Sequence, residues 1–271
     1  GTYSYADASR NIIASPQLFR ERIIGHPFQY ESHRLGLEKS EDSLSFNCFR
    51  TLEELGVLHE VAEIITGRRN PIRPFLFLWG ICTTDDEFEP WDLLIQARQR
   101  FESALPVIRP LTEPDIALWL PGRYLILIEA KFTSMNTSYE RGPRANSSSL
   151  TLDELIGIYQ SPELRTLDYA AAARAFRIYY QLWRNMVFAE WMARLDHPNT
   201  EAYHVNLVRE GYDEDSAAEF TRFVRPEFRH RFQRLTWEQL YRHFEGRPNV
   251  APLTQYLATK TAGLRPAFKL A

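Results

Sequence analysis

Two acidic residues and one lysine lie near the middle of the sequence, at spacings that could bring them to one face of a sheet. Asp115 begins the run DIALWL, while Glu129 and Lys131 end the run YLILIEAKF. Side chains at positions i and i+2 of a strand point to the same side, so Glu129 and Lys131 project together and Ala130 points away into packing. A carboxylate and an ammonium at the end of an apolar run could bind an ion and act on a water molecule.

The turn between the two runs decides whether Asp115 joins this pair. If residues 121–123, Pro-Gly-Arg, form a three-residue loop, Leu120 pairs with Tyr124 and Asp115 lies opposite Glu129. A two-residue Pro-Gly loop would shift the pairing by one residue and separate the two acids. Proline is a poor first residue for the two-residue turns that hairpins favour, because those turns need a positive φ there. We therefore predict the three-residue loop and two opposed carboxylates.

Directly opposed carboxylates have Cβ atoms about 5 Å apart and repel each other by a few kcal/mol at an intermediate dielectric. A divalent cation would convert that repulsion into attraction. Carboxylate oxygens suit Mg²⁺ or Mn²⁺, with water, a backbone carbonyl and a phosphate filling the remaining positions. Lys131 could orient or help deprotonate a water molecule and stabilise developing negative charge. The alternative is a structural salt-bridge cluster at the end of a hairpin.

Composition sets broad limits on the protein. The 271 residues are 44% hydrophobic and 13% aromatic, which is enough for a packed core. The sequence shows no export signal and no run of apolar residues long enough to span a membrane, so we expect a cytoplasmic protein. Cys48 and Cys82 lack the paired spacing of a zinc site or a disulfide framework. The net charge of -3 gives no global attraction to nucleic acid, so phosphate contacts would need a local basic face.

Periodicity predicts alternating helices and strands around these residues. Helices are expected over 43–58, capped by Ser43 or Asp42, over 91–105, and over 236–244 with a Thr cap. Residues 167–195 contain no Gly or Pro, which predicts one long helix. Strands are expected at 75–82, in the two runs of the hairpin and at 202–209, and a polar loop at 133–149. The continuous apolar character of YLILIEAKF predicts a central strand covered by helices on both faces.

The residues Glu113-Pro114-Asp115, followed by Glu129-Ala130-Lys131, resemble the signature of the PD-(D/E)XK nucleases, and the segment TEPDIALWLPGRYLILIEAKF resembles their core hairpin. Two flanking features are similar to those of some restriction-endonuclease-like branches. They are Phe46-Asn47 and the run Gln181-Leu182-Trp183-Arg184-Asn185. With them the resemblance covers roughly residues 40–210.

The resemblance implies an α/β fold, namely a three-layer α/β/α restriction-endonuclease-like core in αβββαβ order with a mixed central sheet. We expect a single nuclease-like domain over residues 1–271, with an N-terminal helical arm at 1–40 and a polar loop and short helix inserted at 133–165. The resemblance also implies a site of Asp115, Glu129 and Lys131, with Mg²⁺ (or Mn²⁺) held by Asp115, Glu129 and the Ala130 carbonyl. Gln181 is a further candidate. The acid that this family supplies from its first helix is assigned to Glu41, with Glu53 and Glu54 as rivals.

The implied activity is metal-dependent hydrolysis of DNA phosphodiester bonds, with nucleic acid as partner and no membrane. Cutting both strands requires two sites, which a homodimer would supply. The alternative is a catalytically silent nuclease-fold protein that binds nucleic acid or a protein partner. No HExxH, GxxxxGK[ST] or GxGxxG motif is present in the sequence.

Simpler roles compete for the flanking residues. Gln181 and Arg184 could form the polar edge of a buried helix face, Glu41 could serve in helix capping, and Asn47 could be a buried amide bonded to the backbone. Three basic groups are candidates for phosphate contacts and could equally be solvated surface. They are Arg68, Arg69 and Arg73; Arg141 and Arg144; and Arg229, His230 and Arg231.

Overall fold

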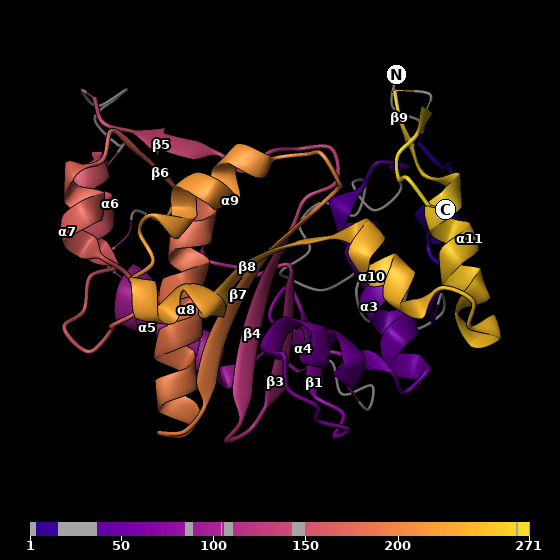
Figure 1. Cartoon of the computed structure of the whole chain (residues 1–271), viewed down its shortest axis with the longest axis horizontal. Helices are drawn as coiled ribbons and strands as arrows, with labels where there is room; N and C mark the ends of the chain where they lie inside the picture. The colour runs from indigo at the N-terminus through magenta and orange to yellow at the C-terminus, as the bar shows by residue number, and fades with distance from the viewer. Residues whose placement is uncertain are drawn as a thin grey trace.

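The computed structural model of the chain contains a mixed six-stranded sheet between two layers of helices (Figure 1). It describes residues 4–15, 37–84, 89–103, 105, 111–142, 150–263 and 265–270. The strand order is β2-β1-β3-β4-β7-β8. The strands are β1 (Phe75–Leu78), β2 (Ile81–Cys82), β3 (Ile116–Leu120), β4 (Tyr124–Ala130), β7 (Glu201–Val208) and β8 (Phe232–Thr236).

The sheet changes direction at its centre. Strands β1, β3 and β4 pair antiparallel, whereas β7 runs parallel to β4 and β8 parallel to β7. All seven residues of β4 are buried, as expected for a strand covered on both sides. Ile126 and Ile128 pack into one core, and Leu125 and Leu127 into the other. The predicted α/β class with a mixed central sheet and helices on both faces is therefore confirmed.

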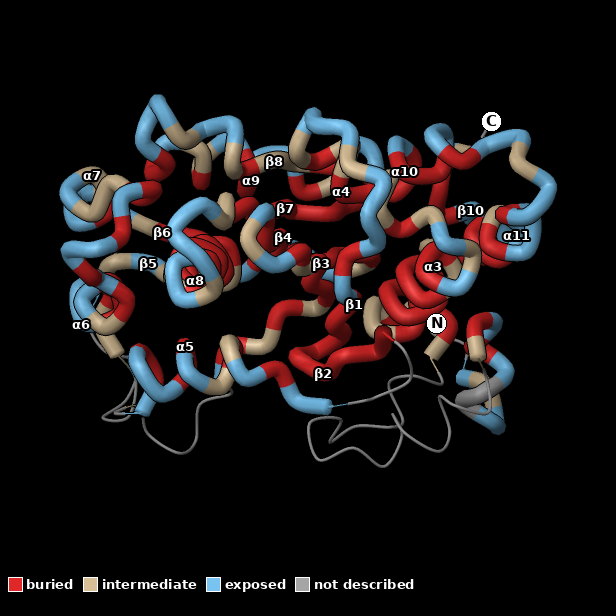
Figure 2. The backbone as a smooth tube through the Cα atoms, turned by 90° about the horizontal axis from the view of Figure 1, so that it is seen from below, coloured by how far each residue is buried: buried red, intermediate tan, exposed pale blue. Residues whose placement is uncertain are grey.

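Each face of the sheet has its own set of helices (Figure 1). The core on one face includes buried residues of α3 (Glu41–Glu54), α4 (Leu58–Thr66), α10 (Trp237–Phe244) and α11 (Ala251–Thr259). The core on the other face includes residues of α5 (Asp92–Glu102), α6 (Leu152–Ile158), α7 (Tyr169–Arg174), α8 (Tyr180–Asp196) and α9 (Glu214–Thr221). Figure 2 shows the strands buried between these layers and the exposed outer surfaces of the helices. The order α3, β1, β3, β4, α8, β7 reproduces the expected αβββαβ core.

Short elements complete the chain. Three 3-10 helices occur in the described residues, namely η1 (Ala8–Asn11), η4 (Pro226–Arg231) and η5 (Pro248–Val250). Two small antiparallel pairs lie outside the main sheet: β5 (Ser138–Glu140) with β6 (Arg177–Tyr179), and β9 (Thr261–Ala262) with β10 (Arg265–Pro266). None of the helices described is long and apolar enough to cross a lipid bilayer.

The prediction of one long helix over 167–195 is wrong. Helix α7 ends at Arg174, Ala175 has extended backbone, and β6 follows before α8 begins at Tyr180. The segment Arg-Ile-Tyr of β6 contains a β-branched and an aromatic residue, and it pairs with β5. A tertiary pairing therefore outweighs the helical propensity of the flanking alanines. Strand β5 also lies within the predicted polar loop 133–149, of which residues 143–149 lie outside the described part.

Two further local predictions are corrected. Helix α3 begins two residues before Ser43, and Ser40 is its cap, because the Ser40 side chain accepts a hydrogen bond from the Ser43 backbone N–H. Residues 75–82 form a hairpin, β1 and β2, in place of a single strand. Most of the expected arm at 1–40 lies outside the described residues, because residues 1–3 and 16–36 are not among them.

The tight turn of this hairpin supports the start of β3. Trp79 and Gly80 both have positive φ, 53° and 80°, as the favoured two-residue hairpin turn requires. The Trp79 backbone N–H donates a hydrogen bond of 3.3 Å to the Asp115 carbonyl, one residue before β3. The turn thus helps to hold the backbone that carries Asp115.

We expect Gly80→Ala to destabilise the protein more than Gly122→Ala. Both glycines have positive φ, which costs an L-residue about 1–2 kcal/mol. A Cβ at Gly80 would also lie 2.5 Å from Leu94 Cδ2, whereas a Cβ at Gly122 meets nothing within 4 Å. Urea unfolding should show an extra loss of roughly 1 kcal/mol for Gly80→Ala, for displacement of Leu94. Equal losses for the two variants would contradict the close approach of Leu94.

Candidate active site

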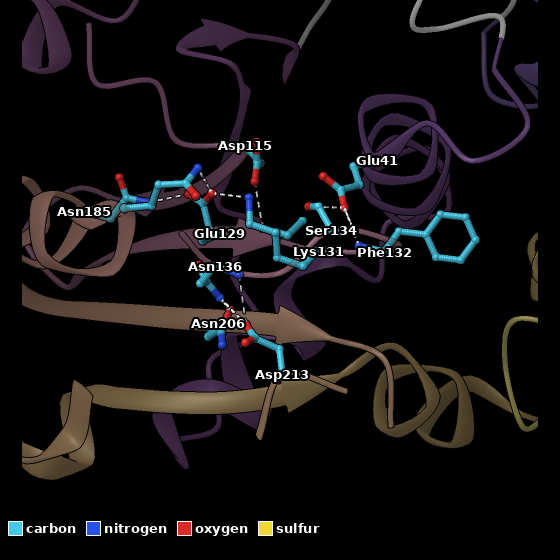
Figure 3. Close-up of polar contacts among 12 residues, drawn as sticks. Glu41, Asp115, Glu129, Lys131, Phe132, Ser134, Asn136, Asn185, Asn206 and Asp213 are labelled. Atoms are coloured by element: carbon cyan, nitrogen blue, oxygen red, sulfur yellow. Dashed lines mark hydrogen bonds and ion pairs between the residues drawn. The ribbon is translucent and has the colours of Figure 1, made fainter. Parts of the chain in front are cut away.

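The acidic residues meet where β4 ends, and the β3–β4 register brings them there. Leu120 pairs with Tyr124 and Ile116 with Ile128, so the loop has three residues, as predicted. One step beyond the last pair, Asp115 and Glu129 stand on neighbouring segments. Figure 3 shows Asp115, Glu129 and Lys131 gathered at this end of the strand. The predicted convergence of these three residues is therefore present.

Asp115 closes the hairpin with its side chain. Its Oδ2 accepts a hydrogen bond of 2.7 Å from the Ala130 backbone N–H. Burial, then the negative charge of Glu129, raise the pKa of Asp115 well above its ordinary value, while Lys131 and this hydrogen bond act in the opposite direction. The site therefore disfavours a second negative charge in the absence of a further cation.

Glu129 is 2% exposed and has hydrogen bonds to both carboxylate oxygens. Oε1 accepts from Lys131 Nζ at 2.7 Å and from Gln181 Nε2 at 2.6 Å. Oε2 accepts from Asn185 Nδ2 at 2.7 Å. Gln181 and Asn185 are four residues apart on α8, so one face of that helix presents both amides to the carboxylate. These contacts orient Glu129 and compensate much of the cost of burying its charge.

The Lys131 backbone is held from both sides. Its N–H donates to the Leu207 carbonyl of β7 at 2.8 Å, and its carbonyl accepts from Trp237 Nε1 at 3.1 Å. Burial acts to lower the pKa of the Lys131 ammonium, but Glu129, Asp115 and Glu41 together raise it above its ordinary value. Lys131 is therefore a protonated, positively charged group at neutral pH.

Glu41 lies beside the site and holds the segment that follows Lys131. In the first turn of α3, its Oε1 accepts hydrogen bonds from the backbone N–H groups of Phe132 at 2.7 Å, Thr133 at 3.2 Å and Ser134 at 3.1 Å. The Ser134 hydroxyl adds a fourth at 2.7 Å (Figure 3). Its charge also acts on Lys131. Glu41 thus acts here as a structural clamp next to the carboxylate pair.

The rival acids of the same helix bind elsewhere. Glu53 contacts Thr84 Oγ1 at 2.6 Å and Arg50 Nη1 at 2.8 Å. Glu54 contacts Arg50 Nε at 3.2 Å. Twelve residues of helix place Glu53 about 18 Å along the axis from Glu41, which is too far to join the same site.

Of the residues in the two flanking motifs, some contact Glu129 and others do not. Asn47 accepts from the Ile13 N–H at 2.8 Å and donates to the Asn11 carbonyl at 2.7 Å, so it is a structural buried amide. Arg184 is 8% exposed, and its guanidinium lies 4.7 Å from the centre of the Tyr180 ring. Within the described residues, its Nε has no hydrogen-bond partner. Gln181 and Asn185 contact Glu129 directly, whereas Asn47 does not reach the site.

A buried polar cluster next to Glu129 escaped the sequence analysis. Asn206 of β7 is the register partner of Glu129, and its Oδ1 accepts from Asn136 Nδ2 at 2.9 Å. The Asn136 side chain also contacts Asp213 (Figure 3). All three residues are at most 6% exposed. Asn206 could have been identified from the sequence, because it is an amide in the otherwise largely apolar strand Ala-Tyr-His-Val-Asn-Leu-Val. Its contact with Asn136, and that of Asn136 with Asp213, could not, because the positions of their loops cannot be predicted from sequence patterns.

Most of the basic candidates lie away from this end of the sheet. Arg68 and Arg69 follow α4, near the first residue of β7, since Arg68 forms an ion pair with Glu201. Residues 229–231 are in η4 and precede β8, which runs parallel to β4. Arg141 contacts Asp153 and the carbonyls of Ala173 and Ala175. Arg144 lies outside the described residues.

The donor set fits a hard divalent cation that keeps part of its water shell. Over the described ranges, no group of three His, Cys, Asp or Glu side chains could hold a metal ion by itself. Mg²⁺ is commonly bound through one or two carboxylates together with waters and a substrate phosphate. The electrostatics of the two acids also favour a bound cation, because Asp115 and Glu129 are close enough for Glu129 to raise the pKa of Asp115. A pair of acids next to one lysine is what such a cation would neutralise.

The αβββαβ core and this pair of acids beside a lysine define a protein with a restriction-endonuclease-like fold. Residues 108–260 match the family model described as "Restriction Endonuclease associating with ARP", and the chain belongs to that family. The matched range includes Asp115, Glu129, Lys131 and Gln181, and it begins after Glu41. Neither the curated proteins nor the solved structures contain a match.

We expect Asp115→Asn to stabilise the protein at neutral pH in the absence of divalent ions. Because the pKa of Asp115 is raised in the folded state, its ionisation is less favourable there than in the unfolded chain. Wild-type stability is therefore lost progressively as pH rises above the ordinary carboxyl value of 3.8. Asparagine keeps an oxygen for the Ala130 N–H and removes the charge. The gain should be roughly 1 kcal/mol at pH 8.

Urea unfolding in a chelator, at pH 8 and at pH 4, checks this prediction. The difference between Asp115→Asn and wild type should shrink towards pH 4. Glu245→Gln, which neutralises an exposed carboxyl at the end of α10, should show little change at either pH. A loss of stability in Asp115→Asn at pH 8 would show that the Asp115 charge is well accommodated without a cation.

Proposed function

We propose that the protein is a metal-dependent nuclease that hydrolyses DNA phosphodiester bonds at the site of Asp115, Glu129 and Lys131. The observation that carries the proposal is the pair of acids at the end of the central strand, of which Glu129 is 2% exposed and lies 2.7 Å from the Lys131 ammonium. Membership of a restriction-endonuclease-like family supports the reaction class. DNA as the substrate is part of the proposal.

The proposed cofactor is Mg²⁺ or Mn²⁺, held by Asp115, Glu129 and the carbonyl of Ala130. Within the described residues, Asp115 Oδ2 accepts one hydrogen bond and Oδ1 accepts none, which leaves lone pairs on this carboxylate that could coordinate a metal ion. When bound, such an ion polarises a phosphate oxygen and lowers the pKa of bound water.

The chain's own residues have separate tasks in this proposal. Lys131 presents its ammonium to the scissile phosphate and stabilises the negative charge that develops on its oxygens. Gln181 and Asn185 are positioning residues, because they hold both oxygens of Glu129 at 2.6 and 2.7 Å. Glu41 positions the segment 132–134 directly after Lys131, and it does not need to contact the substrate.

Electrostatics must act locally in substrate binding. The net charge of -3 provides no overall attraction for a polyanion. A cation at the two acids and the Lys131 ammonium would therefore supply the positive charge at the point of cleavage. Cutting both strands of a duplex calls for two such sites, which a homodimer would provide.

A cleavage assay on plasmid and single-stranded DNA, with Mg²⁺ or Mn²⁺ and in a chelator, tests the proposal. Lys131→Ala and Asp115→Ala should each lose at least a hundredfold in rate, because each removes charge at the reacting phosphate or its cation. The matched controls are Lys269→Ala and Asp215→Ala at exposed positions, and both should cleave as wild type. Unchanged cleavage by the two site variants would show that the activity lies elsewhere.

Calorimetric titration with Mn²⁺ distinguishes the nuclease from a silent protein of the same fold. Wild type should bind Mn²⁺, and Asp115→Ala should bind it at least tenfold more weakly. A protein that shifts DNA in a gel but binds no Mn²⁺ and cuts nothing would be a binding module, and the proposal would then be wrong.

A further inference from the structure

A second polar site lies at the opposite end of the sheet from the carboxylates. A cavity of about 480 Å³ opens there between three segments: 66–70 from the end of α4, 122–124 from the β3–β4 turn to the first residue of β4, and 199–201 up to the first residue of β7. Tyr124 is the first residue of β4 and Glu129 is near its last, so the cavity lies roughly 17 Å along the strand from the acids. Its volume is in the range of small-molecule sites.

Positive charge outweighs negative charge in this cavity. Three arginines line it, Arg68, Arg69 and Arg123, against the single acid Glu201. Arg68 is already paired with Glu201, at 2.8 Å from Nη1 to Oε2. Within the described part of the chain, the guanidinium groups of Arg69 and Arg123 have no hydrogen-bond or ion-pair partner. Two positive charges are thus left without a counter-charge at the cavity.

Glu201 is already engaged by Arg68 and Tyr203, and it contacts neither of these two arginines in the described residues. Its Oε2 also accepts a hydrogen bond from the Tyr203 hydroxyl at 2.7 Å. Burial acts to raise the pKa of Glu201, but Tyr203, Arg68 and Arg231 lower it below its ordinary value. The nearby Glu63 accepts from the Asn70 N–H at 2.7 Å, so it holds the loop rather than an arginine.

Two further features favour a bound ligand. Tyr124 lines the cavity, is 5% exposed, and has a buried hydroxyl with no hydrogen-bond partner in the described residues. A buried polar atom without a partner is uncommon in folded proteins and often indicates a missing ligand or water. The amides Asn70 and Asn199 lie on the same lining and can donate to oxygen.

We propose that this cavity binds a small phosphate-bearing anion, such as pyrophosphate or a nucleoside monophosphate, through Arg69 and Arg123. The planar guanidinium forms paired hydrogen bonds to phosphate oxygens, and two guanidinium groups can offset two negative charges of such a ligand. The site is separate from the carboxylate pair, so the proposal does not depend on the proposed nuclease activity.

Calorimetric titration of the full chain in a chelator, with pyrophosphate and with a nucleoside 5′-monophosphate, tests the inference. Each arginine should contribute about tenfold to affinity. Arg69→Gln and Arg123→Gln should therefore each weaken binding about tenfold, and the double variant should weaken it about a hundredfold. Arg265→Gln, which changes an exposed arginine on β10, should bind as wild type.

The ligand series separates the possible sources of the phosphate. Binding of the monophosphate but not of its nucleoside indicates that the phosphate is what the site recognises. Several results would overturn the inference: no binding at millimolar ligand, binding unchanged in the double variant, or binding lost in Arg265→Gln. The inference would also be wrong if duplex DNA, and neither small ligand, bound wild type more tightly than the double variant. The two arginines would then contact the DNA backbone and not a small molecule.

Discussion

The register of the β3–β4 hairpin is the constraint on which the candidate site depends. Side chains alternate along a strand, so a shift of one residue would turn every side chain of β4 to the opposite face of the sheet. The three-residue turn 121–123 sets Leu120 against Tyr124, and the same register brings Asp115 level with Glu129. Beyond the last residue pair, the Asp115 side chain continues the hydrogen bonding between the two segments, because it accepts a hydrogen bond from the Ala130 N–H. The hairpin and the acid pair are therefore one feature, and a change in either disturbs the other.

Burying Glu129 imposes the next requirement, which is met from α8 and from Lys131. A carboxylate inside a protein needs hydrogen bonds or an opposite charge, because loss of hydration is costly. Glu129 receives both, from two amides one helical turn apart and from one ammonium. Among the described residues, the Asp115 side chain accepts one hydrogen bond, from a backbone N–H, and its pKa is raised although Lys131 acts to lower it. The imbalance between the two acids is characteristic of sites that retain charge for function at a cost in stability.

Sequence patterns predicted the parts of the fold that depend on local periodicity and turn chemistry. The strands around the PGR turn, the Thr236 cap of α10 and the central position of β4 follow from such rules. The division of 167–195 into α7, β6 and α8 does not, because β6 forms through pairing with β5, a distant segment with no strong pattern. In the site, Asp115, Glu129 and Lys131 lie on one hairpin and could be placed by register. Asn206, Asn136 and Asp213 come together only through tertiary contacts.

The two ends of the parallel strands have opposite electrostatic character. The acids Glu129 and Asp115 lie at the carboxyl end of β4, whereas Arg68, Arg69 and Arg123 surround its amino end. Since β7 and β8 run parallel to β4, the loops that precede all three strands gather at the arginine end. A phosphate approaching the acids would therefore depend on Lys131 and on a cation for attraction, because those arginines are roughly 17 Å away, beyond the screening length of about 8 Å at physiological salt. The fold thus places the acid pair and the arginine-lined cavity at opposite ends of β4, so that each can act without the other.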